Sequence, residues 1–318
     1  MLKNMKKNFI RTIKGDIVPA QLGWCQCHEH LFLADGPSRR LNKALYMDNH
    51  EKSLAELVRY KQAGGQSIVD AQPFGCGRMA EKLIKVSDQA GVNIIACTGF
   101  HKTEFFTDKV WLDKQTEETL TEIYLEEIEK GLYSVDNKKL PAKAGIIKCA
   151  AIGRDRKENK TYAKLFSAAA TAAVITGIPI MVHMDIDSDA FSIISFFEKY
   201  NIQPDKIMFC HLDRVKYDFT YHKEIADVGS FLEYDTINRL KYHSNEKEIE
   251  LIVHMVENGF VNKLLLAMDT TNQRLKSYGA DFGLDYILTE FTVPLEQQLD
   301  KEIIRRIMIE NPADALSF

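Results

Sequence analysis

The stretch Ile178-Pro179-Ile180-Met181-Val182-His183 is a short apolar run that ends on a polar residue. It directly follows Gly177, and glycine is favoured where a helix ends because it adopts positive φ without strain. A short run of large apolar side chains after a helix is typical of a parallel strand that is buried on both faces. We therefore expect this segment to be one strand of a sheet in which strands and helices alternate.

The same pattern recurs along the whole chain. Short apolar runs predict eight strands, which we place at residues 22–30, 66–72, 93–99, 144–150, 178–184, 206–212, 230–235 and 262–269. The stretches between them, such as residues 53–60 and 79–86, carry apolar side chains at three- and four-residue spacing and predict outer helices. Residues 8–21, with Gly15-Asp16 between two apolar segments, predict a hairpin. The expected fold class is α/β, a (β/α)8 TIM barrel with a short N-terminal β-hairpin.

Composition and charge narrow the range of functions. The 318 residues are 45% hydrophobic and 27% charged, which is ordinary for a globular protein. No Pro- or Ser-rich linker divides the chain, so we expect one domain over residues 1–318, with the hairpin segment in residues 1–21 and the barrel in residues 22–318. A net charge of -4 without a long basic run disfavours nucleic acid as a partner and favours a small-molecule substrate.

The sequence pattern also bears on localisation and redox state. The basic residues 1–7 are followed by no apolar stretch of signal-peptide length, and no run is long enough for a membrane helix, so we expect a cytoplasmic protein without a membrane partner. The six cysteines, scattered through apolar segments, predict reduced thiols rather than a disulfide framework. The pair Cys25/Cys27 is expected to be small buried residues on a strand.

Candidate metal ligands stand at the ends of the predicted strands. Residues two apart on a strand point to the same face, so His28 and His30 would both aim into the barrel while Glu29 points the other way. Three later strands close on His183, His211 and Asp269. Any one of these could simply be a strand-end residue bonded to a loop. Together, on the rim where barrels carry their chemistry, they predict a metal site.

Lys148 lies in the middle of a predicted buried strand, Gly145-Ile146-Ile147-Lys148-Cys149-Ala150. Burying a bare ammonium group is costly, so such a lysine shifts its pKa or finds a partner. It could extend to a carboxylate at the rim. Alternatively, a neutral amine modified by carbon dioxide would become a carbamate that bridges two metal ions.

This array resembles the phosphotriesterase family of the amidohydrolase superfamily over nearly the whole chain. The resemblance extends to residues 23–31, to Thr98-Gly99-Phe100 and to Gly283-Leu284-Asp285-Tyr286. It implies a buried metal ion on His28, His30 and Asp269, a more exposed ion on His183 and His211, and carbamylated Lys148 as the bridge between them.

The chemistry implied is hydrolysis of an ester-like bond by a hydroxide that bridges two divalent metal ions. Coordination lowers the pKa of water from 15.7 to about 7, and Asp269, as the catalytic residue, would take the proton and deliver it to the leaving oxygen. Imidazole and carboxylate ligands suit zinc, our first expectation, and also manganese, iron, cobalt or nickel.

The loops after the last strands favour a phosphorylated substrate. Arg239 and Lys241 follow the seventh predicted strand, and Arg274, Lys276 and Tyr278 follow the eighth, where barrels often bind phosphate. The sequence is also similar to the branch of the family that opens furanose lactones carrying a 5-phosphate. We therefore predict a lactonase acting on a phosphorylated sugar 1,4-lactone.

Two further segments bear on the substrate. His101, also expected to contact substrate, stands where homoserine lactonases of the family usually carry tyrosine, which disfavours a quorum-signal lactonase. Arg154-Asp155-Arg156 could reach the rim, but its charged neighbours favour a solvated helix start.

Other functions remain open at this stage. The same metal site could serve a phosphotriesterase or carboxylesterase with an apolar pocket. It could also serve only structure or small-molecule binding. A third alternative is a metal-free isomerase or aldolase that uses Lys148 as a Schiff base. A homodimer is implied by the resemblance alone.

Overall fold

The computed structural model describes residues 8–153 and 159–318. Eight parallel strands form one sheet in the order of the chain, with β3 and β10 at its two ends. The strands are β3 (Cys25–Glu29), β4 (Ser67–Asp70), β5 (Asn93–Gly99), β6 (Ala144–Ala151), β7 (Ile180–Met184), β8 (Ile207–Cys210), β9 (Phe231–Tyr234) and β10 (Leu264–Leu266). Seven lie within their predicted ranges and β6 extends one residue beyond its range, to Ala151, so the TIM-barrel prediction is confirmed.

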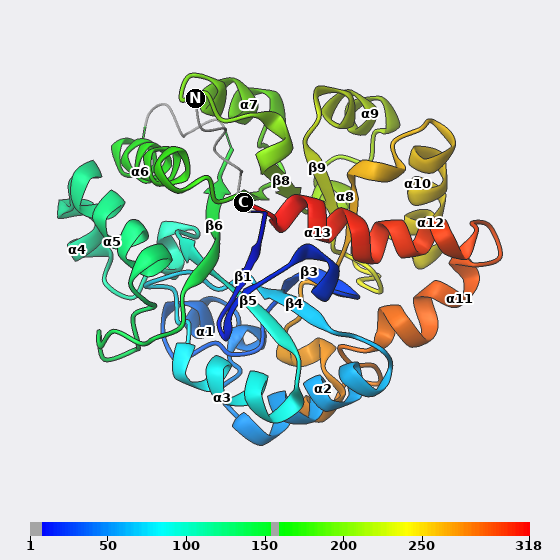
Figure 1. Cartoon of the computed structure of the whole chain (residues 1–318), viewed down its shortest axis with the longest axis horizontal. Helices are drawn as coiled ribbons and strands as arrows, with labels where there is room; N and C mark the ends of the chain where they lie inside the picture. The colour runs from blue at the N-terminus through cyan, green and yellow to red at the C-terminus, as the bar shows by residue number, and fades with distance from the viewer. Residues whose placement is uncertain (1–7, 154–158) are drawn as a thin grey trace.

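Helices surround the strands (Figure 1). They are α1 (Pro37–Leu41), α2 (His50–Gln62), α3 (Ala80–Ala90), α4 (Lys109–Lys114), α5 (Glu117–Glu129), α6 (Lys160–Thr176), α7 (Ala190–Glu198), α8 (Leu212–Val215), α9 (Phe219–Val228), α10 (Asn245–Glu257), α11 (Thr292–Leu295), α12 (Lys301–Arg305) and α13 (Asn311–Leu316). Gly177 ends α6 with φ of 76°, the helix-terminal role predicted for it, and Gly91 ends α3 in the same way with φ of 65°. In the described part of the chain, no helix combines the length and apolar character needed to cross a membrane.

The N-terminal hairpin, β1 (Ile10–Thr12) with β2 (Gly15–Ile17), is antiparallel as predicted. Figure 1 shows β1 and α13 in front of the barrel strands, with the C-terminus near the centre of the view. Ile10 of β1 and Leu316 of α13 belong to the same buried cluster as the apolar side chains inside the barrel. Hairpin and last helix therefore close the N-terminal end of the barrel, which leaves the opposite end for chemistry.

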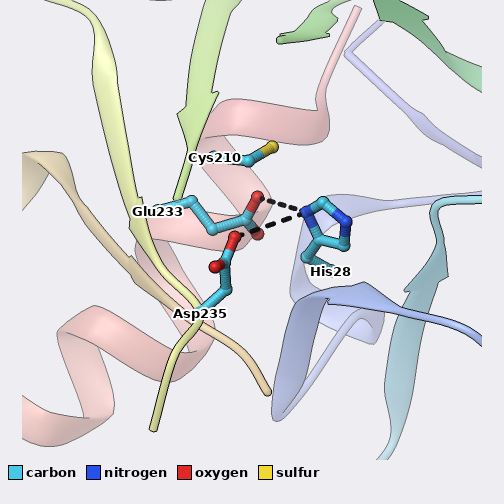
Figure 2. Close-up of side chains that lie close together, drawn as sticks. All are labelled: His28, Cys210, Glu233 and Asp235. Atoms are coloured by element: carbon cyan, nitrogen blue, oxygen red, sulfur yellow. Dashed lines mark hydrogen bonds and ion pairs between the residues drawn. The ribbon is translucent and has the colours of Figure 1, made fainter. Parts of the chain in front are cut away.

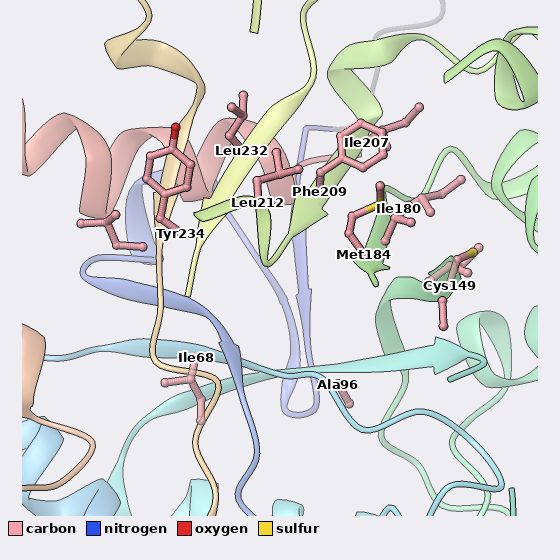
Figure 3. Packing of buried hydrophobic residues seen from close by; sticks show 14 of the residues in the cluster. Ile68, Ala96, Cys149, Ile180, Met184, Ile207, Phe209, Leu212, Leu232 and Tyr234 are labelled. Atoms are coloured by element: carbon pink, nitrogen blue, oxygen red, sulfur yellow. The ribbon is translucent and has the colours of Figure 1, made fainter. Parts of the chain in front are cut away.

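Two apolar layers stabilise the barrel. One fills its interior and includes Cys25, Cys27, Met181 and Met208. The other lies between the strands and the helices, where Figure 3 shows residues such as Phe209. Full burial of a large apolar side chain contributes about 1.5–3 kcal/mol. All six cysteines are buried and none forms a disulfide, in agreement with the predicted reduced thiols.

A β-bulge in the first barrel strand changes which residues face inward. Gln26 pairs with Ile68 but Glu29 pairs with Asp70, so three residue steps on β3 match two on β4. As a result, the consecutive residues Cys27 and His28 both lie inside the barrel.

Glu29 joins the two ends of the sheet. Its carboxylate accepts hydrogen bonds from the backbone N–H groups of Met268 (2.8 Å) and Thr270 (3.2 Å), just beyond β10. The backbone N–H of Asp269 donates to the carbonyl oxygen of His28 at 3.0 Å. These bonds hold Asp269 beside the histidines of β3.

Candidate metal centre

The six predicted metal ligands meet at the C-terminal end of the barrel. All are buried, with exposed fractions of 8% or less: His28, His30, Lys148, His183, His211 and Asp269. His211 and Asp269 follow their strands in the left-handed region, with φ of 67° and 48°. Non-glycine residues adopt this conformation at a cost, and such strain is concentrated at functional sites.

The first group of ligand atoms surrounds one carboxylate oxygen. Oδ1 of Asp269 lies 3.7 Å from Nε2 of His28 and 3.4 Å from Nε2 of His30. Two imidazoles and one carboxylate that converge in this way form a suitable set for a first-row divalent ion.

The second group contains His183 and His211. Nδ1 of His183 and Nε2 of His211 face each other at 2.7 Å, and the His211 ring lies 4.8 Å from the His28 ring, centroid to centroid. The two groups of ligands are therefore adjacent, as a site for two neighbouring ions requires.

Lys148 lies at the floor of the cluster with no exposed surface. Its Nζ donates to the carbonyl oxygen of Ala71 at 2.9 Å and lies 3.3 Å from Nε2 of His28. Both contacts are to neutral groups. A carbamate on this nitrogen would add two oxygen ligands beside His28, so the position fits the predicted bridge.

Three of the histidines are each oriented by a carboxylate. Glu233 lies 3.3 Å from Nδ1 of His28, and Asp235 lies 2.6 Å from Nδ1 of His211. Figure 2 shows Glu233 and Asp235 both directed at His28. On the other side of the cluster, Asp185 lies 3.4 Å from Nε2 of His183. When one imidazole nitrogen donates to a carboxylate, the other presents its lone pair, so each ring is fixed in the tautomer that binds a metal.

Electrostatics also favour metal binding. Burial lowers the pKa of His28, His183 and His211, so these rings are neutral at neutral pH. Burial alone would raise the pKa of Asp269, but the nearby Arg239 guanidinium and His30 hold it well below its usual value. These three imidazoles and the Asp269 carboxylate are therefore deprotonated, as metal ligands must be.

Two arginines contact the outer oxygen of Asp269. Oδ2 accepts hydrogen bonds from Arg239 at 2.6 Å and from Arg214 at 3.0 Å. The guanidinium carbons of Arg239 and Arg214 lie 6.0 Å and 5.1 Å from the centre of the Tyr242 ring. This edge of the site is thus positively charged and bordered by an aromatic ring.

The predicted substrate-binding residues separate into two sets. Arg239 contacts Asp269, and the His101 ring lies 4.7 Å from the His183 ring, so both border the ligand cluster. Arg274 is buried and donates to the carbonyl oxygens of Ile237, Asn238 and Met268.

The remaining three make other contacts, and Nζ of Lys241 lies 4.7 Å from the centre of the Tyr242 ring. The Tyr278 hydroxyl is bonded near α2, to Ser53 and to the carbonyl of Asn49. Lys241 and Lys276 are exposed. Their binding of substrate stays a prediction. Arg154, Asp155 and Arg156 lie outside the described residues.

Sequence reasoning missed the residues around the ligands. Glu233 and Asp235 stand two apart in the otherwise apolar stretch 231–235, a pattern that could have indicated a polar inner face. Asp185 and Arg214 follow His183 and His211 by two and three residues. Their closeness to a ligand was the available signal.

Comparison with known proteins agrees with this geometry. Residues 8–316 match the sequence model of the phosphotriesterase family. The chain belongs to the phosphotriesterase family. A protein named phospho-furanose lactonase from Mycoplasmopsis synoviae (strain 53) is 32% identical over 335 residues, which cover 99% of this chain and 93% of that protein.

Solved structures give the same result. An amidohydrolase from Mycoplasma synoviae superposes with a TM-score of 0.91 at 30% identity, covering 99% of this chain and 93% of that chain. A lactonase from Listeria monocytogenes superposes with a TM-score of 0.88 at 28% identity, covering 98% of this chain and 99% of that chain. The resemblance predicted from sequence is confirmed, and the chain is a phosphotriesterase-family hydrolase of ester-type bonds.

Proposed function

We propose that this phosphotriesterase-family enzyme opens a phosphorylated sugar 1,4-lactone to the corresponding sugar-acid phosphate. The observation that carries the proposal is the contact of Arg239 and Arg214 with the Asp269 carboxylate, because it puts two cationic groups beside the ligand cluster. The names of its relatives, phospho-furanose lactonase and lactonase, support the same class of substrate.

Two divalent ions, held by His28, His30, His183, His211, Asp269 and carbamylated Lys148, would lower the pKa of a water molecule and polarise the lactone carbonyl group. Asp269 lies where it can accept the proton of that water molecule and return it to the leaving oxygen of the ring. Asp235, Glu233 and Asp185 hold the imidazoles in place during this exchange.

The phosphate group is assigned to the arginine side of the site. Guanidinium groups bind phosphate through paired hydrogen bonds. A substrate phosphate that approaches Asp269 would meet Arg239 and Arg214, and both can exchange a bond to Oδ2 for a bond to phosphate oxygen. The aromatic ring of Tyr242 borders these arginines.

The test is a pH-indicator assay with zinc-loaded protein against furanose lactones with and without a 5-phosphate. We expect kcat/KM to be at least about 100-fold higher with the phosphate, since two charge-assisted hydrogen bonds contribute about 1.5–3 kcal/mol each. Equal turnover of both lactones would contradict the phosphate assignment. Preference for paraoxon or an aryl ester would identify the alternative phosphotriesterase or carboxylesterase.

A further inference from the structure

A second group of ligand-type side chains lies outside the metal centre. It contains Asp213 of α8, His243 in the loop before α10, and Glu248 in the first turn of α10, with one ligand atom of each within 4.8 Å of the others. Asp213 and Glu248 have no exposed surface, and the His243 side chain is 8% exposed. None of the three is among the six predicted metal ligands described above.

The tautomer of His243 is fixed by its neighbour. Nδ1 lies 3.1 Å from the carbonyl oxygen of Ser244, which can only accept, so Nδ1 carries the proton. Nε2 is therefore the ring nitrogen that faces inward. It lies 3.1 Å from Oε2 of Glu248 and 3.2 Å from the hydroxyl oxygen of Thr236.

Donors are too few for the acceptors in this cluster. The backbone N–H and the hydroxyl group of Thr236 both donate to Oδ2 of Asp213. Within the described residues, Oδ1 of Asp213 and Oε1 of Glu248 accept no hydrogen bond, and Nε2 of His243 faces Oε2 of Glu248 at 3.1 Å. Buried carboxylate oxygens gathered this closely repel one another unless a positive charge lies between them.

We propose that Asp213, His243 and Glu248 bind a further divalent metal ion, with the Thr236 hydroxyl as an additional oxygen ligand. Two carboxylates balance the charge of one divalent ion, and an imidazole beside them suits zinc or manganese. The ion satisfies Oδ1 of Asp213, Oε2 of Glu248 and Nε2 of His243 together.

The position gives this ion a structural role. It joins α8 to α10 and to the segment 236–243, which carries Arg239 and Tyr242. Backbone bonds from Arg239 to Thr236 (2.8 Å) and from Tyr242 to Arg239 (2.9 Å) make this segment one compact loop. An ion bound at its base fixes the side of the catalytic site where Arg239 lies.

The experiment is equilibrium dialysis of the full chain against micromolar zinc, with bound metal measured by elemental analysis. We expect three zinc ions per wild-type chain, two in Glu248→Gln and two in His243→Gln. Glu246→Gln, an exposed substitution on the same helix turn, is the matched control and should keep three. Far-UV circular dichroism verifies that each variant is folded.

The proposal would be overturned if the wild-type chain bound two ions and Glu248→Gln did not change that number. Protons would then neutralise the cluster of Asp213, His243 and Glu248. A variant of one predicted catalytic metal ligand separates failure of this further site from failure of the proposed function. His30→Ala should reduce binding there while the ion on Glu248 remains, so a failure of either site is seen independently. If Glu248→Gln fails to fold, His243→Gln decides the count.

Discussion

Both oxygens of the Asp235 carboxylate bind His211. Nδ1 of the ring donates to Oδ1 at 2.6 Å, and the backbone N–H of His211 donates to Oδ2 at 3.0 Å. The backbone of His211 is in the left-handed region, so one carboxylate stabilises both the strained main chain and the ring that it carries. Nε2 is thereby presented to the ligand cluster, and Asp235 becomes as important for the geometry as the ligands themselves.

Replacing Asp235 by Asn should weaken metal binding about 10–100-fold, the usual effect of removing a group that orients a ligand. The amide keeps the size of the side chain but no longer stabilises the Nδ1–H tautomer by charge. Zinc affinity is measured by competition with a chromogenic chelator. Asp227→Asn, an exposed substitution on α9, is the control. Wild-type affinity in Asp235→Asn would show that His211 needs no orienting partner.

Substitutions of Lys148 test the predicted carbamate. Lys148→Ala should lose at least one metal ion and about 10³-fold or more in kcat/KM, because a bridging ligand is removed from the floor of the site. Lys148→Glu restores a carboxylate there and should recover part of the metal content. Protein grown with ¹³C-bicarbonate should show a carbamate carbon signal that Lys148→Ala lacks. Its absence in metal-loaded wild-type protein would refute the modification.

Replacing Arg239 and replacing Arg274 by alanine should have different effects on stability and on KM. Arg274→Ala leaves three backbone carbonyl oxygens without their donor, and we expect a loss of about 2–3 kcal/mol in the free energy of unfolding. Arg239→Ala should change stability by less than about 1 kcal/mol but raise KM for a phosphorylated lactone about 10–100-fold. Urea unfolding and steady-state kinetics distinguish the two. A large KM increase in a stable Arg274→Ala protein would instead support the original prediction that Arg274 binds phosphate.

The cluster of predicted ligands could be located from sequence because each of its residues ends or interrupts an apolar run. In a parallel barrel, the carboxyl ends of all strands lie on one rim, so His183, His211 and Asp269 had to meet wherever the loops go. Lys148 was identified for the same reason, as a charge inside an apolar strand.

The parts that could not be predicted depend on pairing and loop geometry. The bulge near Cys27 is a property of β3 and β4 together, and no residue in the strand indicates it. Arg239 and Arg274 lie in neighbouring loops, and the sequence alone does not distinguish their roles. Only the path of the loops turns Arg239 toward Asp269 and Arg274 toward backbone carbonyls.

Glu29 should prove important for barrel closure. Glu29→Ala removes the acceptor for two buried N–H groups beyond β10, and each unsatisfied group costs about 1–3 kcal/mol. Glu29→Gln retains one carbonyl acceptor and should lose about half as much. Urea unfolding gives the stability. Equal values for wild type and Glu29→Ala would mean that the ends of the sheet are held by other contacts.

A buried histidine away from the metal centre predicts the pH dependence of stability. His222 of α9 has no exposed surface, and its ring is bonded to the Tyr234 hydroxyl group at 2.8 Å and to the carbonyl oxygen of Lys216 at 2.7 Å. Burial lowers its pKa in the folded protein. Below pH of about 6.5, the unfolded chain therefore binds a proton that the folded chain does not.

The free energy of unfolding must then fall as the pH is lowered from about 6.5, by up to about 1.4 kcal/mol per pH unit for this residue, until the folded pKa is reached. His222→Gln removes the titration, so the difference in stability between wild type and variant should shrink as the pH falls from 7.5 to 5.5. The measurement is urea unfolding of metal-free protein at several pH values, which keeps metal release out of the comparison. Parallel curves for the two proteins would mean that His222 is protonated equally in the folded and unfolded states.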